Sequence, residues 1–399
     1  MKKVYITAVV TAALTLLAFS FYHSFWTKKV KTDSLMIGFI CENDESTPYT
    51  NNFLMAEAAL EEMYPGKVTV LTKSNVLESE TREPAEELIR KGCTMLFTNS
   101  YSGEFTQMAE ENPDVQFCQV SFQNEASEDV PPNYHTFQGE IYQGRYVSGI
   151  AAGLKLRDLI DRHYITPEEA LVGYVAAFPT ADVISGYTAF FLGVRSVAPE
   201  ALMRVKYTNN WSSYSLEKEA TKDLIDKGCI VLSQHTDTIG PAVACEEAAA
   251  GKQVFFVGYN QSMLDVAPTT ALISTRINWI PYITQAAGAV LEGEPIEKYV
   301  EGKVHGTTDM GAGFEREWVE MVDLNTHIAV QDTDNKLAEA IAALEKGSLQ
   351  VFKGDYTGTD PVNPEDTIDL RDGYIENEFS SAPSFHYVLD DVITIDGEE

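Results

Sequence analysis

The feature that most constrains the fold is a set of short sequence patterns that occurs twice, in the same order. Residues 88–96 read LIRKGCTML, and residues 224–232 read LIDKGCIVL. The apolar run at residues 37–40 matches the run at residues 172–175 in the same way. Further matches keep this order: residues 68–70 with 203–205, and residues 116–117 with 254–255. Ordered recurrence of this kind indicates two units that share one architecture.

Each half of the chain reads as strands that alternate with helices. Residues 35–40 are a continuous apolar run, which is typical of a strand in a buried parallel sheet. Pro48 suits the first turn of the helix that follows, and Gly92 ends a second helix predicted at residues 83–91. The second half repeats the pattern, with strands predicted near residues 171–176, 202–207, 230–233 and 253–258. This alternation predicts an α/β protein with two doubly wound, Rossmann-like lobes, a hinge and an interlobe cleft.

The predicted lobes divide the chain into successive segments. A helix predicted near residues 139–156 lies between the two repeated units, and the sequence becomes polar and acidic near its end. We expect an N-terminal signal anchor or uncleaved signal peptide with its juxtamembrane residues (1–31), lobe 1 (32–138), a crossover helix (139–156), lobe 2 (157–275), a return crossover with helices that complete the lobes (276–354) and an acidic C-terminal tail (355–399).

The first residues of the chain predict a membrane anchor. Lys2 and Lys3 precede residues 4–26, which contain no Asp, Glu, Lys or Arg. A helix of that length spans about 34 Å at ~1.5 Å per residue, enough to cross a bilayer. The stretch ends in bulky aromatic residues instead of the small residues of a cleavage site. We therefore expect an uncleaved anchor in the cell membrane with the rest of the chain extracytoplasmic. A cleaved signal peptide is the alternative, and the lysines that follow the stretch leave the orientation open.

Composition and charge exclude several classes of protein. The 29 Lys and Arg residues and 60 Asp and Glu residues give a net charge of −31, which disfavours binding to nucleic acid because phosphates are repelled. An apolar content of 44% and a charged content of 22% exclude disorder as the main state. The five cysteines show no C-x-x-C spacing, so no zinc site is predicted. We expect these cysteines to be buried and to act as small apolar side chains.

Polar and aromatic residues follow the predicted strands at their carboxyl ends. In open parallel sheets, ligands bind beyond these ends, so the residues there are candidates for a binding site in the cleft. Aromatic planes combined with amide groups suit a flat, uncharged ligand such as a nucleobase or a sugar ring. The candidate ligand-binding residues are Tyr49, Asn51, Asn52, Ser100, Tyr101, Phe178, Trp211, His235, Asp237, Asn260 and Arg276.

Structural roles are the alternative for several of these residues. Tyr49 and Asn52 also suit the start of the first helix, and Arg276 also suits an ion pair. His235 and Asp237 lie two positions apart, so on an extended chain they do not form a catalytic dyad. The chain has no phosphate-binding loop, no nucleophile elbow and no H-E-x-x-H motif. We therefore predict a protein that is not an enzyme, with no catalytic residue, metal ligand or cofactor.

Four segments together resemble the basic membrane protein (BMP) family of substrate-binding proteins. Residues 142–153 read YQGRYVSGIAAG, similar to a helix of that family, and residues 172–196, 229–240 and 257–261 also fit. The resemblance implies a type I periplasmic-binding-protein fold that captures a purine nucleoside or nucleobase and delivers it to an ABC permease. Trp211 matches the aromatic residue that stacks on the base.

The resemblance also contains departures from the family pattern. Asn51 and Asn52 lie where the family has a short Asp- or Asn-bearing loop. Asn260 stands where many members have an Asp that holds the ribose, and Arg276 stands where many have a Lys. The predicted function is therefore extracytoplasmic capture of a purine ligand for uptake. The alternatives are a membrane-anchored sensor that acts on a signalling partner and an enzyme that acts on a nucleoside.

Overall fold

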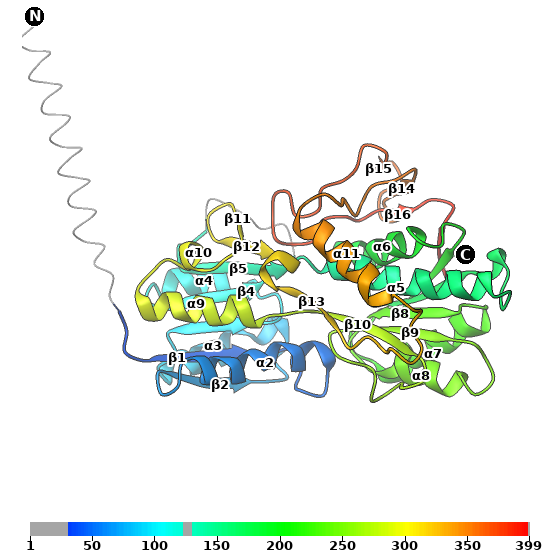
Figure 1. Cartoon of the computed structure of the whole chain (residues 1–399). Coiled ribbons are helices and arrows are strands. Elements are labelled where there is room, and N and C mark those ends of the chain that lie inside the picture. The colour runs from blue at the N-terminus through cyan, green and yellow to red at the C-terminus, as the bar shows by residue number, and fades with distance from the viewer. Residues whose placement is uncertain (1–30, 123–129, 398–399) are drawn as a thin grey trace, which may run out of the picture.

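The computed structural model describes residues 31–122 and 130–397, which form two large sheets with helices on both faces (Figure 1). We call the sheet that contains residues 35–40, with its helices, lobe 1, and the sheet that contains residues 171–176, with its helices, lobe 2. The two lobes lie side by side along the long dimension of the molecule (Figure 1). This arrangement confirms the predicted fold class of two doubly wound α/β lobes.

Lobe 1 has a sheet in which most neighbouring strands are parallel. Its strands are β1 (Leu35–Ile40), β2 (Val68–Lys73), β3 (Met95–Thr98), β4 (Gln116–Val120), β5 (Tyr134–Gly139), β11 (Lys303–His305) and β12 (Asp309–Ala312). They lie in the order β11-β12-β5-β4-β3-β1-β2, and only β11 and β12 pair antiparallel among these described strands. Its helices are α2 (Pro48–Met63), α3 (Arg82–Arg90), α4 (Phe105–Glu111), α9 (Ile280–Glu292) and α10 (Ile296–Tyr299), with the short η1 (Glu78–Glu80).

Lobe 2 repeats this plan. Its strands are β6 (Leu171–Ala176), β7 (Leu202–Tyr207), β8 (Val231–His235), β9 (Phe255–Tyr259), β10 (Ala271–Ile277), β13 (Val319–Val322) and β17 (Ile393–Ile395). Their order is β13-β10-β9-β8-β6-β7-β17, and β13 is antiparallel to β10. Its helices are α5 (Ile141–Asp161), α6 (Ala181–Arg195), α7 (Tyr214–Asp226), α8 (Gly240–Ala248) and α11 (Thr333–Glu345), with the short η2 (Pro167–Glu169) and η3 (Phe314–Arg316).

Apolar layers on the two faces of each sheet form the core. In lobe 1, α2 and α9 pack against one face through residues such as Phe53 and Ile283, and α3 and α4 pack against the other. In lobe 2, α5 and α6 cover one face and α7 and α8 cover the other. The five cysteines are free and buried, in agreement with the sequence interpretation. Burial of these faces, at ~25 cal/mol per Å² of apolar surface, favours the folded state.

The contact between α5 and α6 depends on two glycines. A Cβ on Gly149 would lie 2.0 Å from the carbonyl oxygen of Phe190, and a Cβ on Gly193 would lie 2.0 Å from the carbonyl oxygen of Tyr146. Only a residue without a Cβ allows this approach, because atoms at that separation overlap. The two helices therefore pack in lobe 2 with their backbones almost in contact.

Within the described residues, the chain crosses between the lobes at three neighbouring places. The first crossing lies at Gly139, the second follows Ile277 at the end of β10, and the third precedes Trp318. A Cβ on Gly139 would lie 2.6 Å from Cγ2 of Ile277 and 2.9 Å from the carbonyl oxygen of Trp318. The backbone N–H of Asn278 donates to that same carbonyl oxygen at 2.8 Å. The crossings thus form one compact hinge, and α5 begins just after the first of them.

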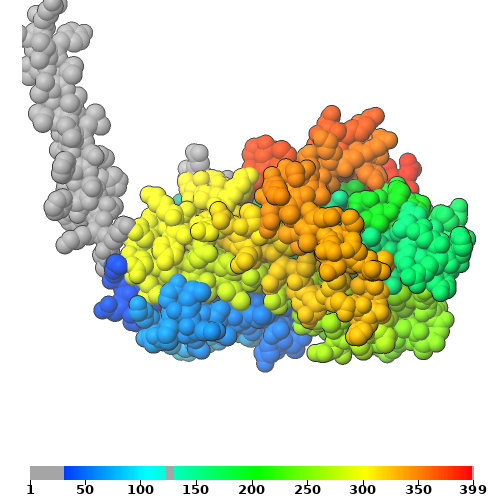
Figure 2. Space-filling model, in the orientation of Figure 1, coloured from blue at the N-terminus to red at the C-terminus, as the bar shows by residue number. Residues whose placement is uncertain are grey.

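Residues 353–397, which we call the C-terminal segment, form short strands and loops. The strands β14 (Thr357–Thr359), β15 (Thr367–Asp369) and β16 (Val388–Leu389) make a small antiparallel sheet, and β17 joins the edge of the lobe 2 sheet beside β7. The segment, orange to red, lies along the upper surface against the yellow part of lobe 1 and the green part of lobe 2 (Figure 2).

The predicted membrane anchor at residues 4–26 lies outside the described residues. Within residues 31–122 and 130–397, none of the helices combines the length and the apolar composition that a membrane crossing needs.

Candidate ligand-binding cleft

A cavity of about 690 Å³ lies between the two lobes, at the carboxyl ends of their parallel strands. A volume of this size is typical of sites for small organic ligands. Lobe 1 contributes residues at or just after the ends of β1 to β5, and lobe 2 contributes residues at or just after the ends of β6 to β10. The C-terminal segment contributes a further part of the wall. The lining residues are Glu42, Tyr49, Glu78, Ser100, Tyr101, Phe122, Gln138, Ile141, Thr180, Ala181, Asp182, Trp211, His235, Asp237, Tyr259, Ile277, Tyr374, Pro383, Ser384 and His386.

Aromatic rings from lobe 2 form a connected group on one side of the cavity. The Trp211 ring lies 6.2 Å from the His235 ring, which lies 4.8 Å from the Tyr259 ring. Phe178 packs behind Trp211, with 5.7 Å between the ring centroids. Offset and edge-to-face contacts of this kind hold each ring in one orientation. The group therefore presents a fixed aromatic surface to the cavity.

A buried carboxylate holds the two loops that carry Trp211 and Asp237. Glu217 is completely buried and accepts hydrogen bonds from the backbone N–H of Ser213 at 3.0 Å and of Thr238 at 3.1 Å. The backbone N–H of Asp237 also donates to the carbonyl oxygen of Trp211 at 2.8 Å. Hydrogen bonds to a buried charge are stronger than those between neutral groups. Both loops are therefore fixed before any ligand arrives.

On the lobe 1 side, Asn99 joins the loops that follow β1 and β3. Its side-chain oxygen accepts a hydrogen bond from the backbone N–H of Glu42 at 3.1 Å, and its amide nitrogen donates to Thr50 at 3.2 Å. The hydroxyl of Tyr49 donates to the carbonyl oxygen of Asn99 at 2.8 Å. Since the Tyr49 hydroxyl is used in this way, the rest of its ring is the part available to the cavity.

Among the described residues, four carboxyl groups and no Lys or Arg line the cavity. Burial raises the pKa of Asp237 well above its ordinary value, and the neighbouring carboxyl groups of Glu217, Glu42 and Asp182 raise it further. Burial also raises the pKa of Asp182 and of Glu42. The cavity is therefore suited to groups that donate hydrogen bonds and unsuited to anions.

A buried arginine lies behind the aromatic group. The Arg145 guanidinium is fully buried, is 3.5 Å from the centroid of the Tyr259 ring and has no hydrogen-bond partner within the described part of the chain. Burial lowers the pKa of His235 well below its ordinary value, and the charge of Arg145 lowers it further. His235 is therefore neutral at physiological pH and can offer one donor and one acceptor.

The structure brings six of the predicted site residues to one cavity wall and leaves five outside it. Those on the wall are Tyr49, Ser100, Tyr101, Trp211, His235 and Asp237. Of the others, Phe178 packs on Trp211, Asn51 lies on α2, and the buried amide of Asn260 has no hydrogen-bond partner among the residues described. The role of all these residues in ligand binding stays a prediction.

Asn52 and Arg276 make contacts of a structural kind. The amide of Asn52 donates to the carbonyl oxygen of Ile277 in the hinge at 2.7 Å. Arg276 forms an ion pair with Glu320, which lies opposite it on β13, with 2.5 Å between Nε and Oε1. Both side chains are therefore directed at neighbouring elements, and neither is part of the cavity lining.

Several wall residues were not found by sequence reasoning. Glu42 and Asp182 follow β1 and β6, so the rule on strand ends could have selected them. The residues of the C-terminal segment gave no such signal, because they follow no strand of either large sheet. These residues are Tyr374, Pro383, Ser384 and His386.

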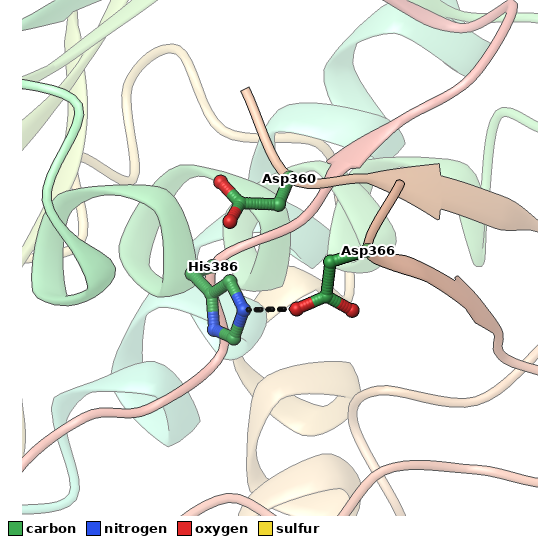
Figure 3. A group of neighbouring side chains, drawn as sticks. All are labelled: Asp360, Asp366 and His386. Carbon is green, nitrogen blue, oxygen red and sulfur yellow. Dashed lines mark hydrogen bonds and ion pairs between the residues drawn. The ribbon is translucent and has the colours of Figure 1, made fainter. Parts of the chain in front are cut away.

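Three side chains of the C-terminal segment are placed so that they can hold a metal ion (Figure 3). Oxygens of Asp360 and Asp366 and a ring nitrogen of His386 lie within 4.8 Å of one another. The Nε2 atom of His386 lies 3.5 Å from Asp366, and its Nδ1 lies 2.7 Å from the carbonyl oxygen of Ser384. All three side chains are partly exposed. Their contacts set the orientation of the His386 ring, which also lines the cavity.

Comparison with known proteins gives the family. Residues 47–348 match the family described as ABC transporter substrate-binding protein PnrA-like. A purine-binding protein of Brucella abortus is 27% identical over 329 residues, which are 81% of this chain and 84% of that protein. A Haloferax volcanii protein named as an ABC transporter glucose-binding protein is 28% identical over 284 residues, 71% of this chain and 66% of that protein. The solved structure of an ABC transporter solute-binding protein from Conexibacter woesei has the same fold, with a TM-score of 0.63, 17% identity and coverage of 79% of this chain and 98% of that chain. The chain belongs to the PnrA-like family of ABC transporter substrate-binding proteins.

Proposed function

We propose that the protein captures an uncharged purine nucleoside or nucleobase in the cavity between its lobes and presents it to an ABC permease. Both lobes contribute to the cavity wall, so a ligand there contacts both. Contacts of this kind favour the closed arrangement of the lobes over the open one. The closed form is then the one that the permease recognises.

The composition of the cavity wall is the observation that carries this proposal. Aromatic rings such as Trp211 and Tyr259 stand beside carboxyl groups such as Asp237 and Asp182. Aromatic faces stack on planar ring systems, and carboxylates accept hydrogen bonds from amino groups and ribose hydroxyls. The name of the Brucella abortus relative, a purine-binding protein, agrees with this ligand class.

The charge of the wall separates nucleosides from nucleotides. The lining, over the part of the chain that the structure describes, contains four carboxyl groups and no Lys or Arg to balance a phosphate. A phosphate brought next to these groups in a partly buried site is repelled and loses its hydration. We therefore expect adenosine to bind and adenosine monophosphate to give no measurable binding.

Calorimetric titration of the purified protein tests the proposal. The protein is unfolded and refolded to remove any bound ligand, and is then titrated with adenosine, guanosine, inosine, the free bases, adenosine monophosphate and glucose. One-to-one binding of a nucleoside or base supports the proposal. Silence from all purines contradicts it.

Trp211→Ala locates the binding event. Loss of the stacked ring is expected to weaken purine binding about tenfold. The reason is that an aromatic pair contributes ~0.5–1.5 kcal/mol in addition to the burial of apolar surface, and both contributions are lost. Tyr214→Ala is the matched control, because Tyr214 is a nearby aromatic residue that is 44% exposed and outside the cavity lining. Equal affinities of the two variants would place the ligand away from Trp211.

A sugar is the second candidate ligand. Carboxylates also accept hydrogen bonds from sugar hydroxyls, and the Haloferax volcanii relative is named as a glucose-binding protein. In the calorimetric titration, heat released with glucose and none with any purine would favour a sugar as the ligand. The cleft would still be the proposed binding site.

A further inference from the structure

The C-terminal segment supplies part of the cavity wall although the family match ends before it. The match covers residues 47–348, whereas Tyr374, Pro383, Ser384 and His386 all line the cavity. Most residues between 376 and 385 are buried, although Phe379 is exposed. We call residues 374–386 the cover. The cover is therefore packed in place on the two lobes.

The cover is joined to lobe 2 by several kinds of contact. Glu376 is 5% exposed and accepts hydrogen bonds from Ser185 of α6 at 2.6 Å and from the backbone N–H groups of Ser384 and Phe385. The Phe385 ring stacks on Phe352 with 4.3 Å between centroids, and the Phe352 ring lies 5.7 Å from that of Tyr142 in α5 of lobe 2. Beyond the cover, β17 pairs with β7 along the edge of the lobe 2 sheet. These contacts combine a buried charge, an aromatic stack and a strand pair.

The contact of the cover with lobe 1 is centred on one carboxylate, which we call the latch. Asp309 of β12 is 2% exposed and accepts hydrogen bonds from Ser380 Oγ at 3.2 Å, from the backbone N–H of Ser381 at 2.6 Å and from Ser381 Oγ. Lys303 of β11 adds a hydrogen bond to the carbonyl oxygen of Asn377 at 3.0 Å. The cover is therefore attached to both lobes at once (Figures 1 and 2).

Asn377 shapes the turn that reaches the latch. Its backbone has a φ of 55°, in the left-handed region that asparagine tolerates better than most residues. Its side-chain amide donates to the carbonyl oxygens of Ser380, Ser381 and Ala382 at 3.2, 2.6 and 3.0 Å. These bonds direct Ser380 and Ser381 toward Asp309. The turn is thus held in the shape that the latch needs.

We propose that the cover is a third component of the binding site, which moves with lobe 2, limits the size of the ligand and holds the lobes closed through its latch on Asp309. The proposal deepens the function proposed above, since it assumes that the cavity holds the ligand. The attachment to lobe 2 is more extensive than the latch, so opening of the cleft separates the cover from lobe 1. Opening must then expose Asp309 to water and break its bonds to the cover.

Hydrogen exchange of the ligand-free full-length protein tests the latch. The Ser380→Ala/Ser381→Ala double variant removes two hydroxyl donors to Asp309 and leaves the backbone donor in place. Amides of residues 309–312 and 377–382 are expected to exchange about tenfold faster, because loss of the two hydroxyl donors weakens the attachment of the cover to Asp309.

The Thr357→Ala/Thr359→Ala double variant is the matched control. Both hydroxyls donate to Asp390 within the C-terminal segment, at 2.6 and 3.0 Å, and neither bond involves lobe 1. This variant is expected to leave the exchange of residues 309–312 unchanged. Equal exchange in the two double variants would overturn the latch. Since no ligand is present, this result is independent of the proposed purine ligand.

Ligand release and ligand size test the other parts of the proposal, with adenosine as the probe. The latch variant is expected to release adenosine about tenfold faster than the Thr357/Thr359 control, as measured by stopped-flow fluorescence.

Tyr374→Ala is expected to bind N6-benzyladenosine or 5′-benzylthioadenosine at least about tenfold better, relative to adenosine, than the unaltered protein. An unchanged release rate and an unchanged preference for ligand size would contradict the proposed role of the cover in the binding site. No binding of any purine by the unaltered protein would contradict the proposed function, and the exchange result would still decide whether the latch exists.

Discussion

At the scale of single residues, the four carboxyl groups of the cavity put like charges close together. The effect of this repulsion on stability is expected to be largest for Asp237, because burial and the neighbouring carboxyl groups raise its pKa well above the ordinary value. An acid with a raised pKa in the folded state holds its proton more tightly there than in the unfolded chain. Its folded form therefore loses stability as the pH rises from about 4, where the unfolded carboxyl ionises, through the raised folded pKa.

Asp237→Asn removes this cost. In the ligand-free protein we expect a melting temperature about 2–4 °C higher at pH 8, the size of a ~1 kcal/mol gain, and no gain below about pH 3, where Asp237 is protonated in both the folded and the unfolded state. Calorimetric scans across that pH range measure the effect. Asp114→Asn is the control, because Asp114 is exposed. A gain that is constant with pH would show that the charge of Asp237 is not its source.

The residues of the cleft could be predicted from sequence only as far as strand ends determine position. Trp211 follows β7 and His235 is the last residue of β8, so the rule on strand ends selects both. The same rule selects Asn52 and Arg276, whose side chains are instead directed at Ile277 and Glu320. The direction of a side chain depends on the neighbours that tertiary packing provides. Sequence position alone does not contain that information.

At the scale of helices, the close contact between α5 and α6 gives a sharp prediction. Gly149→Ala places a Cβ 2.0 Å from the carbonyl oxygen of Phe190, so the helices must move apart. We expect a loss of about 1–3 kcal/mol in the free energy of unfolding, although alanine favours a helix by ~1 kcal/mol over glycine. Urea unfolding measures the difference.

Gly251→Ala is the matched control for this prediction. No atom lies within 4 Å of the position that its Cβ would occupy. The same chemical change is therefore expected to alter the free energy of unfolding by no more than about 0.5 kcal/mol. A loss of similar size in both variants would mean that the α5–α6 contact is not the cause.

Elements with a regular apolar pattern could be predicted, and elements held by distant contacts could not. The apolar runs at residues 35–40 and 171–176 coincide with β1 and β6, because a strand buried on both faces needs an unbroken apolar sequence. The composition of the C-terminal segment predicts only an acidic tail. Its position over the cavity depends on Asp309 and Ser185, which are far away in sequence. No local pattern indicates such contacts.

At the scale of the whole molecule, the net charge of −31 opposes folding through repulsion among acidic groups. Added salt screens this repulsion, and it also weakens surface ion pairs, which contribute only ~0.2–1 kcal/mol each. We expect screening of the net repulsion to be the larger effect. The melting temperature should therefore rise by at least about 2 °C between 20 and 300 mM sodium chloride. Sucrose of equal osmolality is the control, and a fall in melting temperature with salt would contradict the prediction.

The order of the strands in the two sheets also determines when each lobe can be completed during synthesis. The lobe 1 sheet includes β12, residues 309–312, which follows most of lobe 2 in the chain, and the lobe 2 sheet has β17, residues 393–395, at its edge. Chains emerge from the ribosome with their N-terminal end first. The lobe 1 sheet is therefore incomplete until most of lobe 2 has been made, and the lobe 2 sheet is incomplete until residues 393–395 have been made. A nascent chain of this protein keeps open sheet edges until β17 emerges, so a product terminated before residue 393 retains an unpaired edge that favours aggregation.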